Sequence, residues 1–314
     1  MMFTKQAAMR DAYGEALLEL GAANKDVVVV GADTTGSLKS GVFATKYPER
    51  FFNVGIAEQN LVSIAAGLAL AGKIAYSGTY AIFVPGKCVD QIRNNICYPD
   101  LNVKLVCSHG GISVGPDGAS HQQVEDIAIM RAIPRMKVIV PADAPSTKGA
   151  IMAIASIPGP FYVRLTRSAT PVVYEGGFEY KFGKANVLHD GSDVVVFACG
   201  IMVPEALIAA ESLKAKGVSA AVVDLHTVKP IDSDTIAKLA KKCGRVVTAE
   251  EHNILGGMGS AVAEVLGEVS PTPMKRVGVM DTFGESGNPG ELMKKYGLTA
   301  ANIEQAASSL VKSK

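Results

Sequence analysis

The segment FFNVGIAEQNLVSIAAGLALAG, at residues 51–72, contains a single charged side chain, Glu58. This glutamate falls in the first turn of an expected helix, where a carboxylate can simply complement the positive end of the helix dipole. Its neighbours are largely apolar, however, and a carboxyl group in an apolar setting must be paired or take up a proton. Such a perturbed group is a candidate for acid–base chemistry, and position alone leaves both interpretations open.

The loop SHGGISVGPDGASHQ, at residues 108–122, follows an expected strand and combines His109, Asp117 and His121 with several glycines. Long glycine-rich loops within compact domains are commonly functional. The two histidines lack the short spacing of a zinc site, and the loop lacks the Lys-Ser/Thr pair of a phosphate-binding P-loop. Two imidazoles and a carboxylate are suited to hydrogen-bonding a polyhydroxylated substrate.

Two pairs of residues could contact a cofactor or a phosphate. Tyr80 and Phe83 in GTYAIFV could stack on a flat ring, although aromatic residues three positions apart also pack in ordinary cores. Arg10 and Arg167 each lie near the end of an expected element and could clamp a phosphate, although surface arginines are common.

Two further segments are rich in glycine or hydroxyl groups. GADTTGS, at residues 31–37, places Asp33 and Ser37 after an expected strand, as in a loop that contacts a phosphate or polyol. A simple Asx or Ser turn would give the same pattern. The turn LGGMGSAV, at 255–262, lacks the full spacing of a dinucleotide-binding motif and is interpreted as structural.

Short β-branched runs alternate with helical periods throughout the chain. Strands are expected at 26–33, 102–108, 137–143 and 160–166, and helices at 5–21, 56–71, 86–97, 122–132 and 146–156. The helix at 56–71 carries apolar residues on opposite faces and is expected to be buried all round. The alternation predicts an α/β domain with a parallel sheet covered by helices on both faces, and ligands of such sheets collect beyond the carboxyl ends of the strands.

A segment rich in turn formers and aromatic residues interrupts the pattern after Thr170. Strands then resume at 193–200, 217–225, 244–251 and 275–281, with helices at 203–216, 232–242, 258–268 and 289–296. We therefore expect a domain at 1–172, a linker at 173–190 and a second, smaller α/β domain at 191–314.

Composition excludes several classes of partner. The 314 residues include 31 Lys and Arg against 30 Asp and Glu, and this net charge of +1 gives no electrostatic basis for binding nucleic acid or an anionic membrane. Five cysteines without a C-x-x-C pair predict buried thiols in a reduced, cytoplasmic protein. Charges in the first twenty residues argue against a signal peptide, and polar residues interrupt 51–72 too often for a membrane span.

Taken together, GIAEQ at 55–59, GTYAIFV, the loop at 108–122 and MRAIPRMKVIVPAD at 130–143 resemble the transketolase family of thiamine diphosphate enzymes. The resemblance covers residues 1 to about 170, and the second half resembles the C-terminal domain of that family. It implies a pyrimidine-binding domain followed by a transketolase C-terminal domain.

The half of the family that holds the cofactor's diphosphate and Mg²⁺ through a Gly-Asp-Gly motif has no counterpart in this sequence. The chain therefore resembles the C-terminal subunit of a split transketolase. This implies an N-terminal partner subunit that binds most of the diphosphate and the metal, an α2β2 assembly, and transfer of a two-carbon unit from a ketose phosphate to an aldose phosphate.

The resemblance also implies roles for individual residues. Glu58 matches the glutamate that hydrogen-bonds the aminopyrimidine, with Phe83 packing on that ring and Tyr80, Ile56 and Asp33 nearby. His109 and His121 match histidines that bind the donor sugar and shuttle protons. Asp117 matches a residue that binds a substrate hydroxyl. The sugar-phosphate clamp corresponds to Arg10, Ser37 and Arg167.

The sequence departs from the family pattern at Gly86, where an aromatic residue is common, which predicts a more open wall of the pyrimidine pocket. HGG at 109–111 and SH at 120–121 also differ from the usual His-Asp and Thr-His, so the sequence leaves related two-carbon transfer reactions as possible activities.

The first alternative is a β subunit of a 2-oxo acid dehydrogenase, which is expected to lack the Asp-Gly-x-x-His-Gln run and the phosphate clamp. Half of a 1-deoxyxylulose phosphate synthase and a non-catalytic regulatory subunit are the remaining alternatives.

Overall fold

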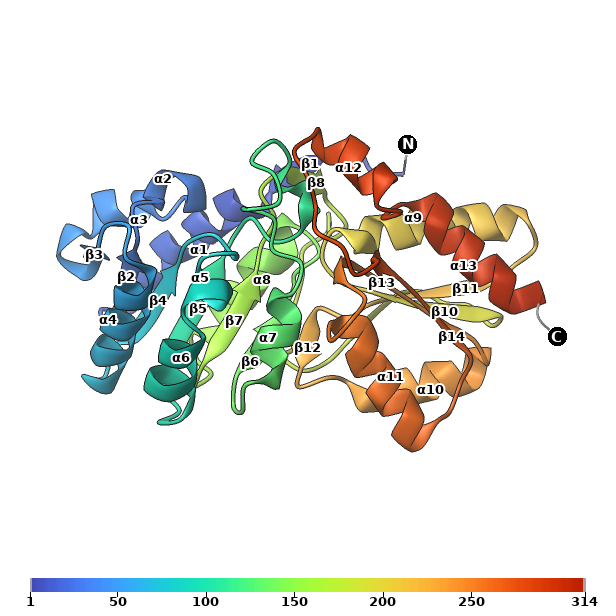
Figure 1. Cartoon of the computed structure of the whole chain (residues 1–314). Coiled ribbons are helices and arrows are strands. Elements are labelled where there is room, and N and C mark those ends of the chain that lie inside the picture. The colour runs from blue at the N-terminus through green and yellow to red at the C-terminus, as the bar shows by residue number, and fades with distance from the viewer. Residues whose placement is uncertain (1, 313–314) are drawn as a thin grey trace.

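Two large β-sheets flanked by helices lie next to each other in the molecule (Figure 1), and a third sheet has two strands. The computed structural model describes residues 2–312. The predicted α/β class, with mainly parallel sheets, is confirmed.

The elements up to Pro171 belong to the half of the molecule at the blue and green end of Figure 1. Its strands are β1 (Gln6–Ala8), β2 (Val27–Gly31), β3 (Phe51–Asn53), β4 (Ile74–Gly78), β5 (Val103–Cys107), β6 (Lys137–Ile139), β7 (Phe161–Arg164) and β8 (Ala169–Pro171). Its helices are α1 (Met9–Ala23), α2 (Thr35–Leu38), α3 (Gly41–Lys46), α4 (Glu58–Leu70), α5 (Val84–Lys87), α6 (Val89–Gln91), α7 (Asp126–Ala132) and α8 (Ala144–Ile154), with helical turns η1 (Pro48–Arg50), η2 (Ile92–Cys97) and η3 (Ile112–Val114).

The larger sheet has the strand order β12-β6-β7-β5-β4-β2-β3, and its neighbouring strands are parallel except for the antiparallel β12. Successive side chains of a strand point to opposite faces of the sheet. A continuous apolar run such as that of β2 therefore places apolar side chains on both faces. Val27 and Val29 pack with α1 and α8 on one face, whereas Val28 and Val30 pack with α4 and η2 on the other. The sheet is therefore covered on both faces, as predicted.

The second half builds a five-stranded sheet of order β14-β13-β10-β11-β9, in which only the edge strand β9 is antiparallel. Its strands are β9 (Asn186–His189), β10 (Val194–Ala198), β11 (Ala220–Asp224), β13 (Val246–Asn253) and β14 (Met274–Val279), and β12 (Thr227–Lys229) joins the first sheet. Its helices are α9 (Met202–Ala215), α10 (Ser233–Cys243), α11 (Met258–Val269), α12 (Pro289–Lys295) and α13 (Ala300–Lys312).

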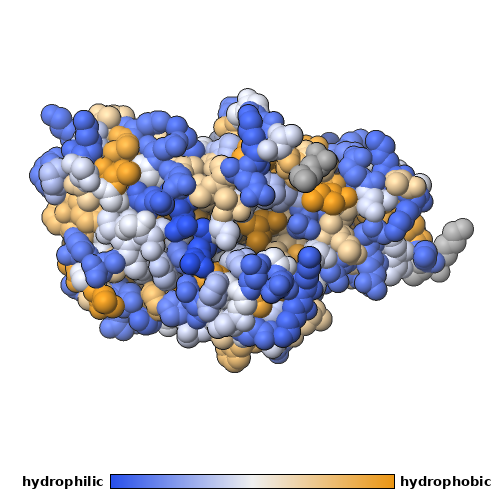
Figure 2. All heavy atoms as spheres, turned by 90° about the horizontal axis from the view of Figure 1, so that it is seen from above, coloured by the Kyte–Doolittle hydropathy of each residue, from blue (hydrophilic) through white to orange (hydrophobic). Residues whose placement is uncertain are grey.

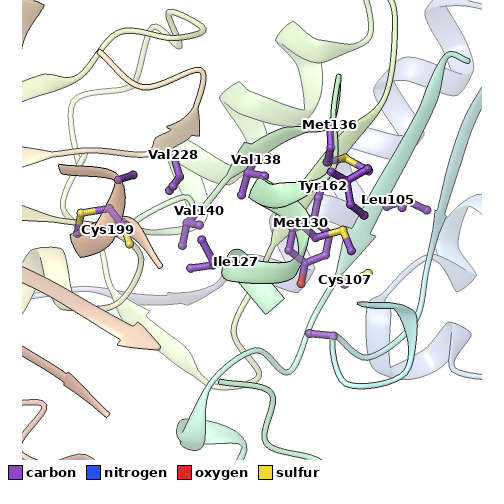
Figure 3. Packing of buried hydrophobic residues seen from close by; sticks show 14 of the residues in the cluster. Leu105, Cys107, Ile127, Met130, Met136, Val138, Val140, Tyr162, Cys199 and Val228 are labelled. Atoms are coloured by element: carbon purple, nitrogen blue, oxygen red, sulfur yellow. The ribbon is translucent and has the colours of Figure 1, made fainter. Parts of the chain in front are cut away.

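One apolar cluster continues from the first sheet into the second (Figure 3). Leu105 lies at one end of the view and Cys199 at the other, with Tyr162, Met130 and Ile127 between them. All five cysteines are buried and unpaired by disulfides, as the sequence predicts. The two halves therefore share one buried apolar cluster.

Several expected element boundaries were wrong. The helix expected from residue 5 begins at Met9, because residues 6–8 pair with β8. The helix expected from residue 122 begins at Asp126, and the single helix expected at 86–97 is divided into α5, α6 and a π-helical turn. Strand β4 and helix α13 were not predicted.

The prediction that the helix at 56–71 is buried all round was also wrong. Helix α4 packs one face on β2 and β4, but Gln59 and Asn60 are exposed and the Leu70 side chain is 76% exposed. The apolar positions Val62, Ala66 and Ala69 are buried, whereas the exposed positions of the helix are Gln59, Asn60, Gly67 and Leu70.

The expected linker at 173–190 includes β9, which hydrogen-bonds to the second sheet. Within residues 2–312, no helix has the length and apolar character needed to cross a membrane.

Candidate active site

Five neighbouring strands of the first sheet carry predicted site residues just beyond their carboxyl ends. In the strand order β7, β5, β4, β2 and β3 these residues are Arg167, His109, Tyr80, Asp33 and Glu58. Parallel strands direct their carboxyl ends to one edge of the sheet, so residues far apart in the sequence lie along a single line. Figure 2 views the molecule from above Figure 1 and shows hydrophilic residues in the middle of this face, between separate apolar patches.

Four rings form a contact group at this edge. The Tyr80 ring stacks on the imidazole of His109, with centroids 3.8 Å apart and planes inclined by 18°, and it also stacks on Phe83 at 5.7 Å. His121 approaches the edges of Phe83 and Tyr80 at 5.5 and 6.4 Å. The structure thus brings together both predicted histidines and both predicted aromatic residues.

The three residues of the predicted phosphate clamp meet beside the rings. The Arg10 guanidinium donates to the backbone oxygen of Ser37 at 2.5 Å, and the Tyr80 hydroxyl donates to Ser37 Oγ at 3.0 Å. Arg167 donates to the backbone oxygen of Val114 at 2.7 Å. Burial lowers the pKa of Arg10, and the nearby charge of Arg167 contributes in the same direction against the opposing effect of Asp11. Two guanidinium groups within electrostatic reach of each other suit an anion with more than one negative charge.

His109 is a buried, neutral imidazole. Burial first, and then the positive charges of Arg10 and Arg167, lower its pKa to about 3. Its Nδ1 lies 2.7 Å from Ser108 Oγ, and its backbone adopts a left-handed conformation with φ 62°. A neutral imidazole can donate one hydrogen bond and accept another, so His109 can contact a carbonyl or hydroxyl without adding charge.

Glu58 is buried at the start of α4 and is paired with a residue that sequence reasoning missed. The Lys87 ammonium lies 3.1 Å from Glu58 Oε1 and 4.5 Å from the centroid of the Phe83 ring. The Glu58 side chain is 11% exposed and that of Lys87 is 50% exposed. The pair therefore joins a buried carboxylate to a half-exposed ammonium group. Of the two possibilities for a buried carboxyl group, the structure therefore contains the paired form. The only sequence signal for Lys87 is its place four residues after Phe83.

The remaining predicted residues lie at the rim. Asp33 is exposed, with a left-handed backbone, and hydrogen-bonds the side chain of Asn53 at the end of β3. Ile56 is 79% exposed, and Asp117 is exposed in the loop after β5. Within residues 2–312, no group of three or more His, Cys, Asp or Glu side chains has a metal-binding arrangement.

Comparisons with known proteins identify both halves of the chain. Residues 5–172 match the family "Transketolase, pyrimidine binding domain", and residues 183–303 match "Transketolase, C-terminal domain". A Methanocaldococcus jannaschii protein named as a transketolase C-terminal section is 49% identical over 94% of this chain and 93% of its own length. The 6-deoxy-6-sulfo-D-fructose transketolase subunit SqwH of a Clostridium species is 41% identical over 98% of this chain and 95% of its own length.

A solved structure described as a split gene transketolase in an inactive β4 tetramer superimposes with a TM-score of 0.91 and 49% identity. The match covers 97% of this chain and 98% of that one. The full-length agreement of fold and sequence confirms the resemblance inferred from the motifs. The chain belongs to the transketolase family, as a pyrimidine-binding domain followed by a transketolase C-terminal domain.

Proposed function

We propose that this chain is the C-terminal subunit of a thiamine diphosphate-dependent transketolase that is active only with an N-terminal partner subunit. The reaction transfers the C1–C2 ketol unit of a ketose phosphate to the aldehyde carbon of an aldose phosphate. The observation that carries the proposal is the meeting of Glu58, the ring group and the two clamp arginines at one edge of the sheet.

The residues at this edge fit the pyrimidine end of thiamine diphosphate. The Lys87 ammonium contacts both the Glu58 carboxylate and the face of the Phe83 ring, so both groups lie around one cation. Glu58 would hydrogen-bond the ring nitrogen and Phe83 would pack on the ring, with Tyr80, Ile56 and Asp33 nearby. When bound, the cofactor supplies the electron sink for breaking the bond between C2 and C3 of the donor.

The partner subunit would bind the diphosphate and Mg²⁺, because this chain lacks the Gly-Asp-Gly motif for them. The relatives named as a subunit or as a C-terminal section support a two-chain enzyme. A similar chain forms an inactive β4 tetramer, which agrees with inactivity in the absence of a partner. We propose an α2β2 assembly for the active enzyme.

This chain's own side chains would handle the sugar. Neutral His109, together with His121, would bind the donor's carbonyl and hydroxyl oxygens and move the proton of the C3 hydroxyl as the C2–C3 bond breaks. Asp117 would bind another hydroxyl group. After transfer, the acceptor's aldehyde oxygen gains a proton. The overall reaction therefore neither consumes nor releases protons.

The arginine pair would bind the terminal phosphate, with Ser37 beside it. The SqwH subunit is named for a sugar with a terminal sulfonate, which is also an anion. The arrangement of Arg10 and Arg167 therefore supports an anionic end group but leaves the choice of sugar open. This pair of charges also favours the transketolase reaction over the 2-oxo acid dehydrogenase alternative, whose substrates carry no phosphate.

The test is co-expression with candidate N-terminal subunits, followed by an assay of two-carbon transfer from xylulose 5-phosphate to ribose 5-phosphate with thiamine diphosphate and Mg²⁺. We expect activity from the pair and none from either chain alone. Robust turnover by this chain alone would refute the two-chain proposal. A stable pair inactive with phosphorylated ketoses of five to seven carbons would refute the reaction.

A further inference from the structure

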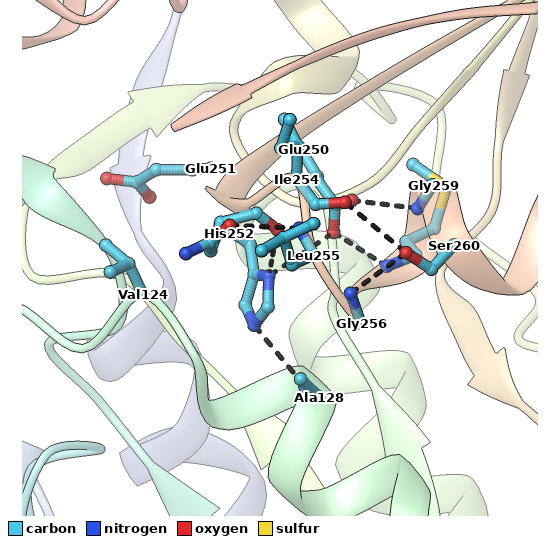
Figure 4. Close-up of polar contacts among 12 residues, drawn as sticks. Val124, Ala128, Glu250, Glu251, His252, Ile254, Leu255, Gly256, Gly259 and Ser260 are labelled. Carbon is cyan, nitrogen blue, oxygen red and sulfur yellow. Dashed lines mark hydrogen bonds and ion pairs between the residues drawn. The ribbon is translucent and has the colours of Figure 1, made fainter. Parts of the chain in front are cut away.

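Three consecutive polar residues at the end of β13 direct their side chains to different places (Figure 4). The Glu250 carboxylate accepts hydrogen bonds from the backbone N–H groups of Met258 and Gly259 at 2.7 and 2.8 Å. It therefore caps the N-terminus of α11 within the second half of the chain. This contact also explains the glycine-rich turn at 255–262 as a structural feature.

His252 joins the second half to α7 of the first. Its Nε2 accepts from the backbone N–H of Ala128 at 3.3 Å and its Nδ1 donates to the backbone oxygen of Asn253 at 2.6 Å (Figure 4). The N–H of Asn253 donates to the backbone oxygen of Val124 at 2.7 Å. These bonds fix the end of β13 against the first half of the molecule.

Glu251, between them, reaches the loop that carries His109. Its side chain is buried, and Oε1 accepts from the backbone N–H of Ser113 at 2.6 Å. Gly111 has φ 85°, and a Cβ atom there would overlap the Glu251 carboxyl group. Position 111 therefore requires glycine both for its left-handed backbone and for the space that the Glu251 carboxyl group occupies.

Arg164, at the end of β7, contacts the same part of the loop. Its guanidinium donates to Asp126 Oδ2 at 2.8 Å and to the backbone oxygen of Glu251 at 2.8 Å. A Cβ atom at Gly110 would lie 2.5 Å from Arg164 Nε, so the loop backbone rests directly on the guanidinium. Residues 110–113 are thus held between a cation of the first half and a carboxylate of the second.

The rest of the loop contacts a second segment of the C-terminal half, residues 284–289. Gln122 Nε2 donates to the backbone oxygens of Ile112, Gly115 and Glu285, at 3.1, 3.3 and 2.9 Å. The backbone at Gly118 approaches Ser286, where a Cβ atom would lie 2.5 Å from the hydroxyl oxygen. Gln122 directly follows His121, so both histidines are flanked by contacts to the second half.

We propose that the C-terminal half positions the substrate loop, with Glu251 and Gln122 as positioning residues for His109 and His121. This inference rests on the proposed function, because it assumes that these two histidines bind the donor sugar. Neither residue needs to contact substrate. Catalysis depends on placing reacting groups to within a fraction of an ångström, so a loosened loop reduces turnover even when the chain stays folded.

Two changes test the proposal in the complex with the partner subunit. Gln122→Glu is isosteric but replaces the donor with an oxygen that faces three carbonyl oxygens. Glu251→Ala removes the acceptor for Ser113, whereas Glu251→Gln keeps an oxygen there. We expect Gln122→Glu and Glu251→Ala to lower kcat on the order of 10- to 100-fold and to raise the donor KM. We expect Glu251→Gln to restore most of the loss.

Asp232→Ala is the matched control. Asp232 caps α10 by accepting from the N–H of Thr235 at 3.2 Å, and it lies in the same half without contacting the loop. The control should lower stability and leave kcat and KM unchanged below the unfolding transition. Wild-type kinetics in both loop variants, or an equal kinetic loss in the control, would overturn the proposal.

A second readout does not depend on activity. Amide hydrogen exchange of the full chain should be faster at residues 112–118 in Gln122→Glu, but not in Asp232→Ala. Unchanged exchange there would overturn the positioning role. An inactive wild-type complex with the expected exchange pattern would instead refute the proposed function alone, so the two failures are distinguishable.

Discussion

The ring of Tyr80 stacks on the imidazole of His109 at a centroid distance of 3.8 Å, while its hydroxyl group donates to Ser37 Oγ at 3.0 Å. One side chain therefore shields the predicted sugar-binding histidine and contacts the predicted phosphate clamp. The two contacts can be separated by mutation.

Tyr80→Phe keeps the stack and loses one hydrogen bond, which is worth about 1 kcal/mol or roughly a fivefold change in kcat/KM. Tyr80→Ala removes the stack and admits water, so the pKa of His109 should rise toward its ordinary value. NMR titration of labelled histidine in the chain measures this, with His109→Asn to assign the signal. An unchanged His109 pKa in Tyr80→Ala would show that the ring does not shield the imidazole.

The low pKa of His109 also predicts a pH dependence of stability. The unfolded imidazole gains a proton near pH 6.5, whereas the folded one, with a pKa of about 3, stays neutral. Its contribution to folding is therefore complete above pH 6.5 and is lost progressively as the pH falls toward 3. Denaturant unfolding at pH 7.5 and 5.0 should show a smaller loss of stability in His109→Asn than in the wild type. Equal losses would contradict the buried neutral imidazole.

Arg10 should contribute to affinity for the charged end of the substrate. A charge-assisted hydrogen bond is worth about 1.5–3 kcal/mol, so Arg10→Ala should raise the KM of a phosphorylated donor by roughly 10- to 100-fold. The KM of the same ketose without phosphate should change little. Arg276→Ala, an exposed arginine on β14, serves as the control. An equal effect of Arg10→Ala on both donors would remove Arg10 from the clamp.

Two ion pairs should differ strongly in their contribution to stability. The Arg164 side chain is 3% exposed beside Asp126, so Arg164→Met leaves an uncompensated buried carboxylate and should cost about 3–5 kcal/mol. The Lys87 side chain is 50% exposed beside the 11% exposed Glu58, so solvent weakens this pair and Lys87→Met should cost about 1–2 kcal/mol. Denaturant unfolding measures both, and similar costs for the two variants would contradict this ranking.

Much of the fold and of the candidate site could be predicted because both follow from local patterns. Runs such as VVVV at 27–30 alternate with helical periods, and the candidate residues directly follow strands whose carboxyl ends meet. Strand β4 was missed because IAYSG contains few β-branched residues. Helix α13 was missed although its buried positions Ile303, Ala307 and Leu310 keep the helical i, i+4, i+7 spacing, because only two of the three are large apolar residues.

Contacts between distant segments could not be predicted from local patterns. Ser113 and Glu251 are 138 residues apart in the sequence, and no local pattern indicates that one contacts the other. Likewise, the spacing of Glu58 and Lys87 gives no sign of an ion pair, which depends on how α4 and α5 pack. Sequence therefore identified the chemical groups better than the side chains that hold them in place.

Glu58 is central to the account because it is the buried carboxyl group at the pyrimidine end of the proposed site. Glu58→Gln keeps the size of the side chain but removes its acid–base function, which is typically worth 10²- to 10⁴-fold in rate. Glu49→Gln is the matched control, since Glu49 is largely exposed on η1 and pairs with its neighbour Arg50.

The most direct test is the rate of two-carbon transfer by the reconstituted two-chain complex at saturating thiamine diphosphate, Mg²⁺ and substrates. We expect Glu58→Gln to lower kcat on the order of 100-fold or more while assembly and folding persist, and Glu49→Gln to have the wild-type rate. A wild-type rate in the Glu58→Gln complex would contradict this expectation.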